Sequence, residues 1–292
     1  MSAFPTSPAG RPITRVGFAF NPTSETSLAL RDRALEWCTA TGLAAWSSAA
    51  AERQAMADAM PGTQAVVVLG GDGTFLRAVQ AVAATSEEVG ILGVNVGKVG
   101  FLSQVEADAL VPTLARLHQG AYALEPRMVL EAVVRRRDGD DGERLVALNE
   151  AAVVRGGRPN VVRLDVEIGG SHLATYIADG VLVATPTGST AYSFSAGGPI
   201  LEPSSRNLVV TAVAAYLAAI RSVVVGPRQT VVIRVLDGRG VVLSIDGHID
   251  VPLALGDRIE ASARERPVQF VVPEGSLPFW DLLRQKAELL PS

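Results

Sequence analysis

An apolar run that leads straight into a glycine-rich loop constrains this chain more than any other stretch. In "VVVLGGDGTFLRA", residues 66–78, a strand of buried character ends at the loop 70–74, and a helical pattern follows it. Ligands of parallel α/β sheets bind beyond the carboxyl ends of the strands. Glycines at that position let the backbone approach a ligand closely. The stretch therefore predicts an α/β sheet with a ligand site at the loop 70–74.

The single carboxylate of this loop, Asp72, admits two interpretations. Backbone N–H groups and the amino end of a helix attract phosphate. We therefore expect the loop to bind the phosphates of a phosphoryl donor through Gly70, Gly71, Gly73 and Thr74. A carboxylate repels phosphate, so Asp72 indicates contact with a hydroxyl group or a metal ion. The alternative is a simple turn in which Asp72 caps the following helix.

Strands and helices alternate through the first part of the chain. Apolar runs predict strands at 15–20, 65–69 and 91–97, and helical spacing predicts helices at 24–41, after the loop 70–74, and before Gly120. This order indicates a parallel sheet covered by helices on both faces. We expect a Rossmann-like α/β domain over residues 13–125, although Leu76 stands where a dinucleotide-binding G-x-G-x-x-G turn needs its third glycine.

The pattern changes after Pro126. Short runs of alternating apolar and polar residues follow one another, separated by glycine, aspartate and proline turns. Such runs are typical of stacked antiparallel sheets. We expect a β-sandwich domain over 126–273 that binds the nucleotide. A C-terminal segment, 274–292, has helical spacing over 279–290 and is expected to pack on the first domain.

Length and composition exclude several classes of function. A chain of 292 residues is long enough for two domains, and its net charge of −4 argues against nucleic acid as a partner. The longest apolar stretch, 208–220, is too short to cross a bilayer. No membrane association and a cytoplasmic location are therefore expected. We expect the thiol of Cys38 to be packed in the core. The three histidines are far apart in the sequence, so we expect no metal site that is held by the protein alone.

A second stretch, "ADGVLVATPTGSTAYSFSAGGPI" at residues 178–200, is rich in small hydroxyl side chains. Hydroxyls and backbone groups can hydrogen-bond the edges of a purine and a ribose, while the ring of Tyr192 offers a stacking face. This combination indicates a nucleoside pocket. The alternative is a loop whose serine and threonine side chains only satisfy its own backbone.

Four motifs in order resemble the NAD kinase family: "GGDGT" at 70–74, "NVGKVGFL" at 95–102, "NE" at 149–150 and "DGVLVATPTGSTAYSFSAGGPI" at 179–200. The similarity extends over most of residues 65–290. Phosphofructokinases and lipid kinases carry loops like the first motif, whereas the last motif is far more specific. The resemblance implies an α/β domain plus a β-sandwich. It also implies transfer of the γ-phosphoryl of ATP, or of polyphosphate, to the 2'-hydroxyl of the adenosine ribose of NAD, giving NADP.

The resemblance also implies roles for individual residues. Asp72 would be catalytic, Asn149 and Glu150 would hold the adenosine half, and Asp179 would contact the nicotinamide end. The residues implied to contact NAD are Asp72, Gly73, Arg77, Asn149, Glu150, Asp179, Thr190, Ala191, Tyr192, Ser195 and His248. Magnesium or another divalent cation would accompany ATP. A homodimer or homotetramer is expected from the same resemblance.

One segment departs from the family pattern. Relatives carry Pro-His shortly before an Arg-Pro step, whereas this chain has Ala215-Tyr216, and Ser222 follows Arg221. Substrate affinity and subunit assembly are the properties this departure would affect. Two other functions stay open at this point: a kinase of another alcohol, such as diacylglycerol, and a non-catalytic regulator that binds a dinucleotide.

Overall fold

The computed structural model describes residues 11–97, 100–139, 141–157 and 161–288. These residues divide into two compact units. The β unit is Arg127–Pro267. The α/β unit comprises the described residues of Pro5–Pro126 and Val268–Ser292.

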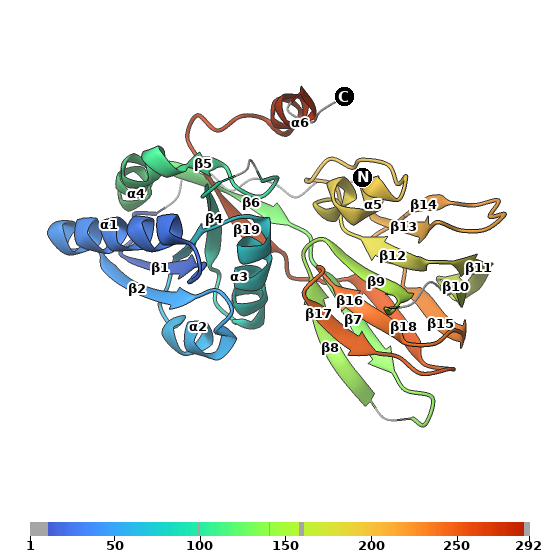
Figure 1. Cartoon of the computed structure of the whole chain (residues 1–292). Coiled ribbons are helices and arrows are strands. Elements are labelled where there is room, and N and C mark those ends of the chain that lie inside the picture. The colour runs from blue at the N-terminus through green and yellow to red at the C-terminus, as the bar shows by residue number, and fades with distance from the viewer. Residues whose placement is uncertain (1–10, 98–99, 140, 158–160, 289–292) are drawn as a thin grey trace. The chain divides into compact units, whose positions relative to one another are not determined.

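A seven-stranded sheet forms the centre of the α/β unit, in the order β2-β1-β3-β4-β19-β6 with β5 beside β4 (Figure 1). Its strands are β1 (Arg15–Phe20), β2 (Ala44–Ala49), β3 (Ala65–Leu69), β4 (Gly90–Asn95), β5 (Val105–Glu106), β6 (Tyr122–Arg127) and β19 (Val268–Pro273). The pairs β1–β2, β1–β3, β3–β4, β4–β5 and β4–β19 are all parallel. The carboxyl ends of β1, β2 and β3 therefore meet at one edge, and the predicted α/β class is confirmed.

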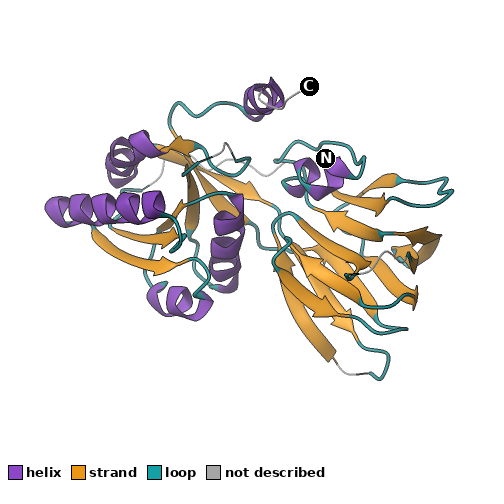
Figure 2. Ribbon diagram, viewed as in Figure 1, coloured by secondary structure: helices purple, strands orange, loops and turns teal. Residues whose placement is uncertain are grey.

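Helices cover both faces of this sheet (Figures 1 and 2). They are α1 (Glu25–Thr41), α2 (Arg53–Ala59), α3 (Asp72–Ala84) and α4 (Leu110–His118), the last preceded by the 3-10 turn Ala107–Ala109. On one face α1 packs with α4, and on the other α2 packs with α3. The two-faced covering explains why β3 and β4 are buried along their whole length and read as continuous apolar runs.

Helix α1 shows how local sequence sets an element and its packing. The Ser24 side chain accepts a hydrogen bond from the Ser27 N–H, and Gly42 ends the helix at a φ of 73°. Leu30, Ala34 and Cys38 form its buried face. Burial raises the pKa of the Cys38 thiol to about 11, so this side chain is the packed thiol that the sequence predicts.

The end of the second predicted domain differs from the prediction. The β-sandwich was expected to run to residue 273, yet β19 pairs in parallel with β4 and belongs to the α/β unit. The Phe270 ring of β19 packs edge-on against Phe75 of α3, with 5.1 Å between centroids. The alternating pattern "VQFVV" does not distinguish these two sheets, because a strand of either one can carry it. Helix α6 (Phe279–Glu288) follows β19, and its residues Leu282 and Gln285 line a pocket with Glu106.

The β unit holds two six-stranded sheets in the part of the chain that the structure describes. One runs β11-β10-β15-β18-β7-β8 and the other β14-β13-β12-β9-β16-β17, with antiparallel pairing within each. Side chains from both sheets, among them Leu164, Val183, Ile233 and Leu243, share one apolar core. The predicted β-sandwich is therefore confirmed.

The strands of the first sheet are β7 (Leu130–Arg135), β8 (Asp141–Ala147), β10 (Val162–Ile168), β11 (Ser171–Ala178), β15 (Val231–Asp237) and β18 (Arg258–Ala263). Those of the second sheet are β9 (Glu150–Arg155), β12 (Gly180–Ala184), β13 (Leu208–Val213), β14 (Ser222–Val225), β16 (Val241–Ile245) and β17 (Ile249–Pro252). No helix among the described residues is long and apolar enough to cross a membrane.

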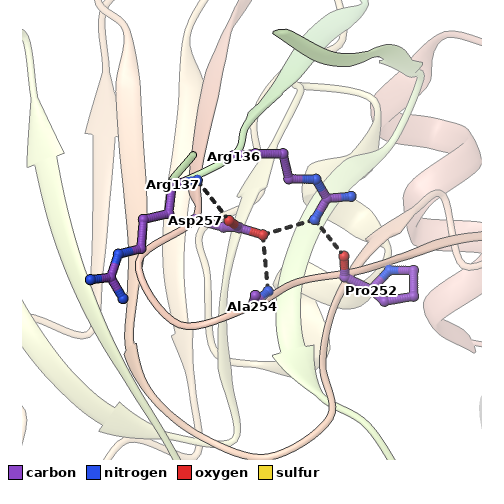
Figure 3. Close-up of polar contacts among 5 residues, drawn as sticks. All are labelled: Arg136, Arg137, Pro252, Ala254 and Asp257. Atoms are coloured by element: carbon purple, nitrogen blue, oxygen red, sulfur yellow. Dashed lines mark hydrogen bonds and ion pairs between the residues drawn. The ribbon is translucent and has the colours of Figure 1, made fainter. Parts of the chain in front are cut away.

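A buried aspartate ties the β7–β8 connection to the loop between β17 and β18 (Figure 3). The Asp257 carboxylate accepts hydrogen bonds from the backbone N–H groups of Ala254 (2.9 Å) and Arg137 (3.0 Å) and from the Arg136 guanidinium (2.8 Å). The same Arg136 group donates to the Pro252 carbonyl at 2.8 Å. Burial by itself raises the pKa of Asp257, but these hydrogen bonds and the Arg136 charge outweigh it, so the pKa is held below its usual value.

Replacing Asp257 with alanine should lower the free energy of unfolding by about 3 kcal/mol, because it leaves a half-buried arginine unpaired and orphans backbone donors. Since the folded-state pKa is depressed, this stabilisation should be present at neutral pH and lost as the pH falls through that pKa, below the usual value of 3.8. Urea unfolding at neutral and acidic pH measures both effects. Asp250→Ala, at an exposed position of β17, is the control; an equal loss in both variants would contradict the assignment.

Candidate active site

The glycine-rich loop lies where the sequence places it, at the carboxyl end of β3. Helix α3 begins at Asp72 with Gly71 as its N-cap, and the N–H groups of Thr74 and Phe75 donate to the Gly71 carbonyl at 2.9 and 3.1 Å. An added Cβ at Gly71 or Gly73 would meet no atom within 4 Å. Packing therefore does not require glycine at these two positions, and the space beside them is open to a ligand.

Asp72 joins the first two sequence motifs. Its Oδ2 accepts a hydrogen bond from the Phe101 N–H at 2.9 Å, and its Oδ1 accepts one from the Leu102 N–H at 3.1 Å. A Cβ at Gly100 would lie 2.2 Å from Oδ1, so the carboxylate occupies this place only because residue 100 is glycine. The N-cap of α3 is Gly71, and Asp72 is the first residue of the helix, so the alternative in which Asp72 caps the helix is wrong. Lys98 and Val99 of the same motif lie outside the described residues.

A pocket of about 550 Å³ opens at the carboxyl ends of β1, β2 and β3. Gly71, Gly73, Thr74 and Arg77 line one side of it, and the Asn21 turn lines the other. The Arg77 side chain is exposed and forms no ion pair within the described parts of the chain. An unpaired guanidinium beside the amino end of a helix is suited to an anion such as phosphate.

In the β unit, three neighbouring strands bring the other motifs together. Strand β9 runs antiparallel to both β12 and β16, with Glu150 opposite Ala184 and Ala151 opposite Ile245. The start of β9 therefore lies beside the ends of β12 and β16. This arrangement places the Asn149–Glu150 motif between the residues that follow β12 and those that follow β16.

The residues after β12 fix the backbone at this end of the sheet. The Thr185 hydroxyl donates to the Leu148 carbonyl and accepts from the Gly188 N–H at 3.1 Å, and the Thr185 N–H donates to the Asn149 carbonyl at 2.8 Å. A Cβ at Gly188 would lie 2.1 Å from that Asn149 carbonyl oxygen. Close approach of two backbone segments thus requires glycine at this position.

Several hydroxyls of this motif serve the loop itself. The Ser189 hydroxyl lies 2.6 Å from the Pro186 carbonyl and accepts from the Leu201 N–H at 2.9 Å, and the Thr190 hydroxyl donates to the Thr187 carbonyl at 3.2 Å. The self-satisfying alternative therefore describes these side chains correctly. Tyr192 differs, because its side chain on α5 (Tyr192–Ser195) is 40% exposed. Helix α5 packs against β12 (Figure 1).

Charged groups surround Tyr192 and Glu150. The backbone N–H of Tyr192 donates to the Glu150 carboxyl group, and burial, followed by the Asp246 charge, raises the pKa of Glu150 to about 8 against that hydrogen bond. Arg155 pairs with Asp179 at 2.9 Å. Burial raises the pKa of Tyr192, helped by the charges of Asp179 and Glu150 and opposed by Arg155.

The contacts within each unit show which predicted residues lie together. In the β unit, Glu150, Asp179 and Tyr192 form one cluster, with Asn149, Thr190 and Ala191 adjacent in the chain; Ser195 is exposed at the end of α5. His248 lies on the β16–β17 turn, its Nδ1 3.2 Å from the Asp246 carbonyl oxygen. In the α/β unit, the loop 70–74 and Arg77 share one pocket.

One residue of the β-unit cluster was not predicted from the sequence. Arg155 ends a strand with an ordinary alternating pattern, and only the fold brings it to Asp179. The resemblance to the family does point to the polar turn Asp246-Gly247-His248, but not to the contacts that Asp246 makes with residues 148–150. Among the described residues, no group of three or more histidine, cysteine, aspartate or glutamate side chains is arranged to hold a metal ion.

Comparison with known proteins now fixes the family. Residues 17–122 match the model for the ATP-NAD kinase N-terminal domain, and residues 148–272 match that for the ATP-NAD kinase C-terminal domain. The chain belongs to the NAD kinase family. The resemblance drawn from the four motifs is thereby confirmed.

Relatives in the NAD kinase family share long stretches with this chain. The NAD kinase of Symbiobacterium thermophilum is 45% identical over 222 residues, which cover 76% of this chain and 77% of that protein. The NAD kinase of Corynebacterium glutamicum is 40% identical over 234 residues, covering 80% and 79%.

Two solved structures share the fold. Yeast NADH kinase complexed with NADH has a TM-score of 0.83 at 21% identity and covers 97% of this chain and 89% of its own. The NAD kinase from Archaeoglobus fulgidus in complex with ATP has a TM-score of 0.75 at 22% identity, covering 95% and 100%.

Proposed function

We propose that this protein is an NAD kinase that transfers the γ-phosphoryl group of ATP, or of polyphosphate, to the 2'-hydroxyl of the adenosine ribose of NAD. The observation that carries the proposal is the Asp72 carboxylate, fixed by two backbone N–H groups at the amino end of α3 and beside an open glycine loop. Membership of the NAD kinase family supports the same reaction.

Asp72 acts on the acceptor alcohol. When phosphoryl transfer proceeds through a loose transition state, the protein contributes mainly by positioning the reactants and by neutralising charge on the phosphates. A carboxylate is too weak a base to remove a ribose hydroxyl proton before attack. Asp72 therefore orients the 2'-hydroxyl and accepts its proton late, as the bond to phosphorus forms and the hydroxyl becomes acidic.

The donor phosphates bind at the glycine loop. Gly71 and Gly73 offer open space and backbone N–H groups, Thr74 lines the same pocket, and Arg77 adds a positive charge. Phosphate oxygens of ATP, and the Asp72 carboxylate beside them, would hold a divalent cation such as Mg²⁺. When bound, the cation neutralises charge on the phosphates.

The adenosine half of NAD binds in the β unit. The exposed ring of Tyr192 stacks on adenine, and Asn149 and Glu150 hydrogen-bond the adenosine. Asp179, which pairs with Arg155 at 2.9 Å, contacts the nicotinamide end of NAD in this proposal. His248, next to the Asp246 turn, contacts NAD near the reacting phosphate, and the exposed Ser195 borders the pocket.

Replacing Tyr192 with alanine should raise the KM for NAD about tenfold, because stacking of a base on an aromatic ring contributes about 1–3 kcal/mol. The KM for ATP should change little. Steady-state kinetics with each substrate varied in turn measure both constants. Phe194→Ala is a matched control, since Phe194 is also an exposed aromatic residue of α5. Equal changes in the two KM values would remove Tyr192 from the adenine pocket.

The decisive experiment incubates the purified protein with NAD, magnesium and either ATP or polyphosphate, and measures NADP with a coupled dehydrogenase. Formation of NADP supports the proposal, and the two donors give their order of preference. Phosphorylation of diacylglycerol without NADP would favour the kinase of another alcohol. Tight NAD binding without NADP from either donor would favour a non-catalytic regulator.

Assembly into a homodimer or homotetramer and a cytoplasmic location stay predictions. The connection between β13 and β14, where this chain has Ala215-Tyr216, exposes Tyr216 by 70% and Leu217 by 84%. A second copy of the chain would cover such apolar surface. Light scattering of the purified protein, compared with a Leu217→Ser variant, measures the assembly.

A further inference from the structure

The proposed reaction leaves one buried acid of the β unit without a role. Asp246 follows β16 on the β16–β17 turn with a φ of 50°, and it is 6% exposed. Its Oδ2 accepts a hydrogen bond from the Leu148 N–H at 2.9 Å, and its Oδ1 accepts from the N–H groups of Asn149 (2.8 Å) and Glu150 (3.1 Å). The Asp246 N–H in turn donates to the Glu150 carbonyl at 3.0 Å.

These contacts fasten the turn to the first residues of the Asn149–Glu150 motif. Backbone groups of 148–150 are held by Asp246 on the β16 side and by Thr185 on the β12 side. A positive φ is uncommon for a residue other than glycine, but aspartate is among those that adopt it most often. Burying a carboxylate is costly, and at Asp246 three backbone N–H donors offset that cost.

Glu150 is the acid that this charge faces. Glu150 is 7% exposed, and its carboxyl group accepts the Tyr192 N–H. Its Oε2 atom is buried and has no hydrogen-bond partner within the described residues. A buried polar atom without a hydrogen-bond partner lowers the stability of the fold by about 1–3 kcal/mol. Oε2 is therefore the atom of this motif that is available to hydrogen-bond a ligand.

We propose that Asp246 is a positioning residue that keeps the Glu150 carboxyl group protonated, so that Glu150 donates a hydrogen bond to an acceptor atom of the adenosine half of NAD. That NAD is the ligand depends on the proposed function. That the proton lies on Glu150 depends only on contacts within the protein.

The hydrogen bonds decide which of the two acids is ionised. Both oxygens of Asp246 face backbone N–H donors, an arrangement that a carboxylate satisfies and that leaves no acceptor for a proton of its own. Burial raises the pKa of Asp246, while these donors and the nearby His248 oppose the rise. Burial and the adjacent Asp246 charge raise the pKa of Glu150 to about 8, so a single proton shared by the pair resides on Glu150 at neutral pH.

The remaining titratable groups nearby leave the mildly alkaline range to Glu150. Burial and the charges of Asp179 and Glu150 raise the pKa of Tyr192 above its usual value of 10. NAD binding measured between pH 7 and 9 therefore reports on the protonation of Glu150. Because the pKa of Glu150 is raised, the neutral form that binds NAD is present at pH 7. The affinity for NAD falls toward pH 9 as Glu150 loses its proton.

NAD binding to the whole protein, measured by calorimetry without a phosphate donor, tests the inference. The Kd should rise about tenfold between pH 7 and 9 if only the neutral form binds. In Glu150→Gln, whose amide donates at every pH, the Kd should vary little over this range. Glu265→Gln, which removes an exposed carboxyl of the same unit, should keep the wild-type pH dependence. A wild-type Kd that is constant over this window would overturn the proposal.

A second measurement reads the proton without NAD. In carbon-13 spectra of protein labelled at glutamate carboxyls, the Glu150 signal is assigned by its loss in Glu150→Gln. It should titrate near pH 8, and in Asp246→Asn its midpoint should move to lower pH, because the neighbouring charge is gone. A purely structural role of Asp246 would not move that midpoint in a folded variant.

The two measurements separate this inference from the proposed function. Titration of Glu150 near the ordinary glutamate range would overturn the role of Asp246 even if NADP is formed. If Asp246→Asn does not fold, the wild-type titration and the Glu150→Gln binding profile still decide the proton's location. Absence of NAD binding at every pH would overturn the hydrogen bond to NAD together with the proposed function, and titration near pH 8 would then support the Asp246 part alone.

Discussion

Asp72→Asn should bind NAD with nearly the wild-type Kd while its turnover falls by about 10²–10⁴-fold, the range of a general base. The asparagine side chain keeps the size of the aspartate but cannot accept the proton of the 2'-hydroxyl. The Asp72 carboxylate is half-exposed at the start of α3 and already oriented by Phe101 and Leu102, so it is available to a substrate alcohol. Steady-state turnover and calorimetric NAD binding measure the two properties separately.

A control is needed because asparagine also alters the contact with residues 101–102. The Phe101 and Leu102 N–H groups now each donate to a carboxylate oxygen. In the asparagine variant one of them would face the amide NH₂, which is itself a donor and cannot accept that hydrogen bond. Asp108→Asn, at an exposed position of the same unit, makes the same change of charge without that contact. Turnover close to wild type in Asp72→Asn would exclude the catalytic role. A parallel loss of NAD binding would instead indicate a general collapse of the site.

The parts of the fold that the sequence predicts are those set by local patterns. The Val-rich run at 65–69 and the glycine loop after it define β3 and the start of α3, because a strand buried on both faces is apolar throughout. Strand β2, "AAWSSA", and the short helix α2 escaped prediction. Neither has a strong period, and β2 forms because β1 offers it an edge to pair with.

The site was predicted in the same uneven way. Its motifs identify Asp72 and Tyr192 through residue type and spacing, but not the partners that hold them. The Phe101 N–H that binds Asp72 lies 29 positions away in the chain, and the N–H groups that bind Asp246 lie 96 to 98 positions away. The Asp72 contact forms where β3 and β4 pair, and the Asp246 contacts form where β9 and β16 pair. No local pattern encodes either of them.

Gly100→Ala should lower turnover by about 10–100-fold, since misplacing a catalytic group by about 1 Å can cost that much. The added Cβ would lie 2.2 Å from the Asp72 Oδ1, so the carboxylate must move away from the Phe101 and Leu102 N–H groups. The KM for NAD should change much less than turnover. Gly226→Ala is the matched control: it adds a Cβ that meets no atom within 4 Å.

A double variant distinguishes a positioning role of Gly100 from simple damage to the loop. If Gly100 acts through Asp72, adding Gly100→Ala to Asp72→Asn should cost little further turnover, because the group that it positions has already lost its function. If the alanine damages the loop independently, the two losses should multiply. Multiplying losses, or a fall in NAD affinity as large as the fall in turnover, would contradict the role that the 2.2 Å approach assigns to this glycine.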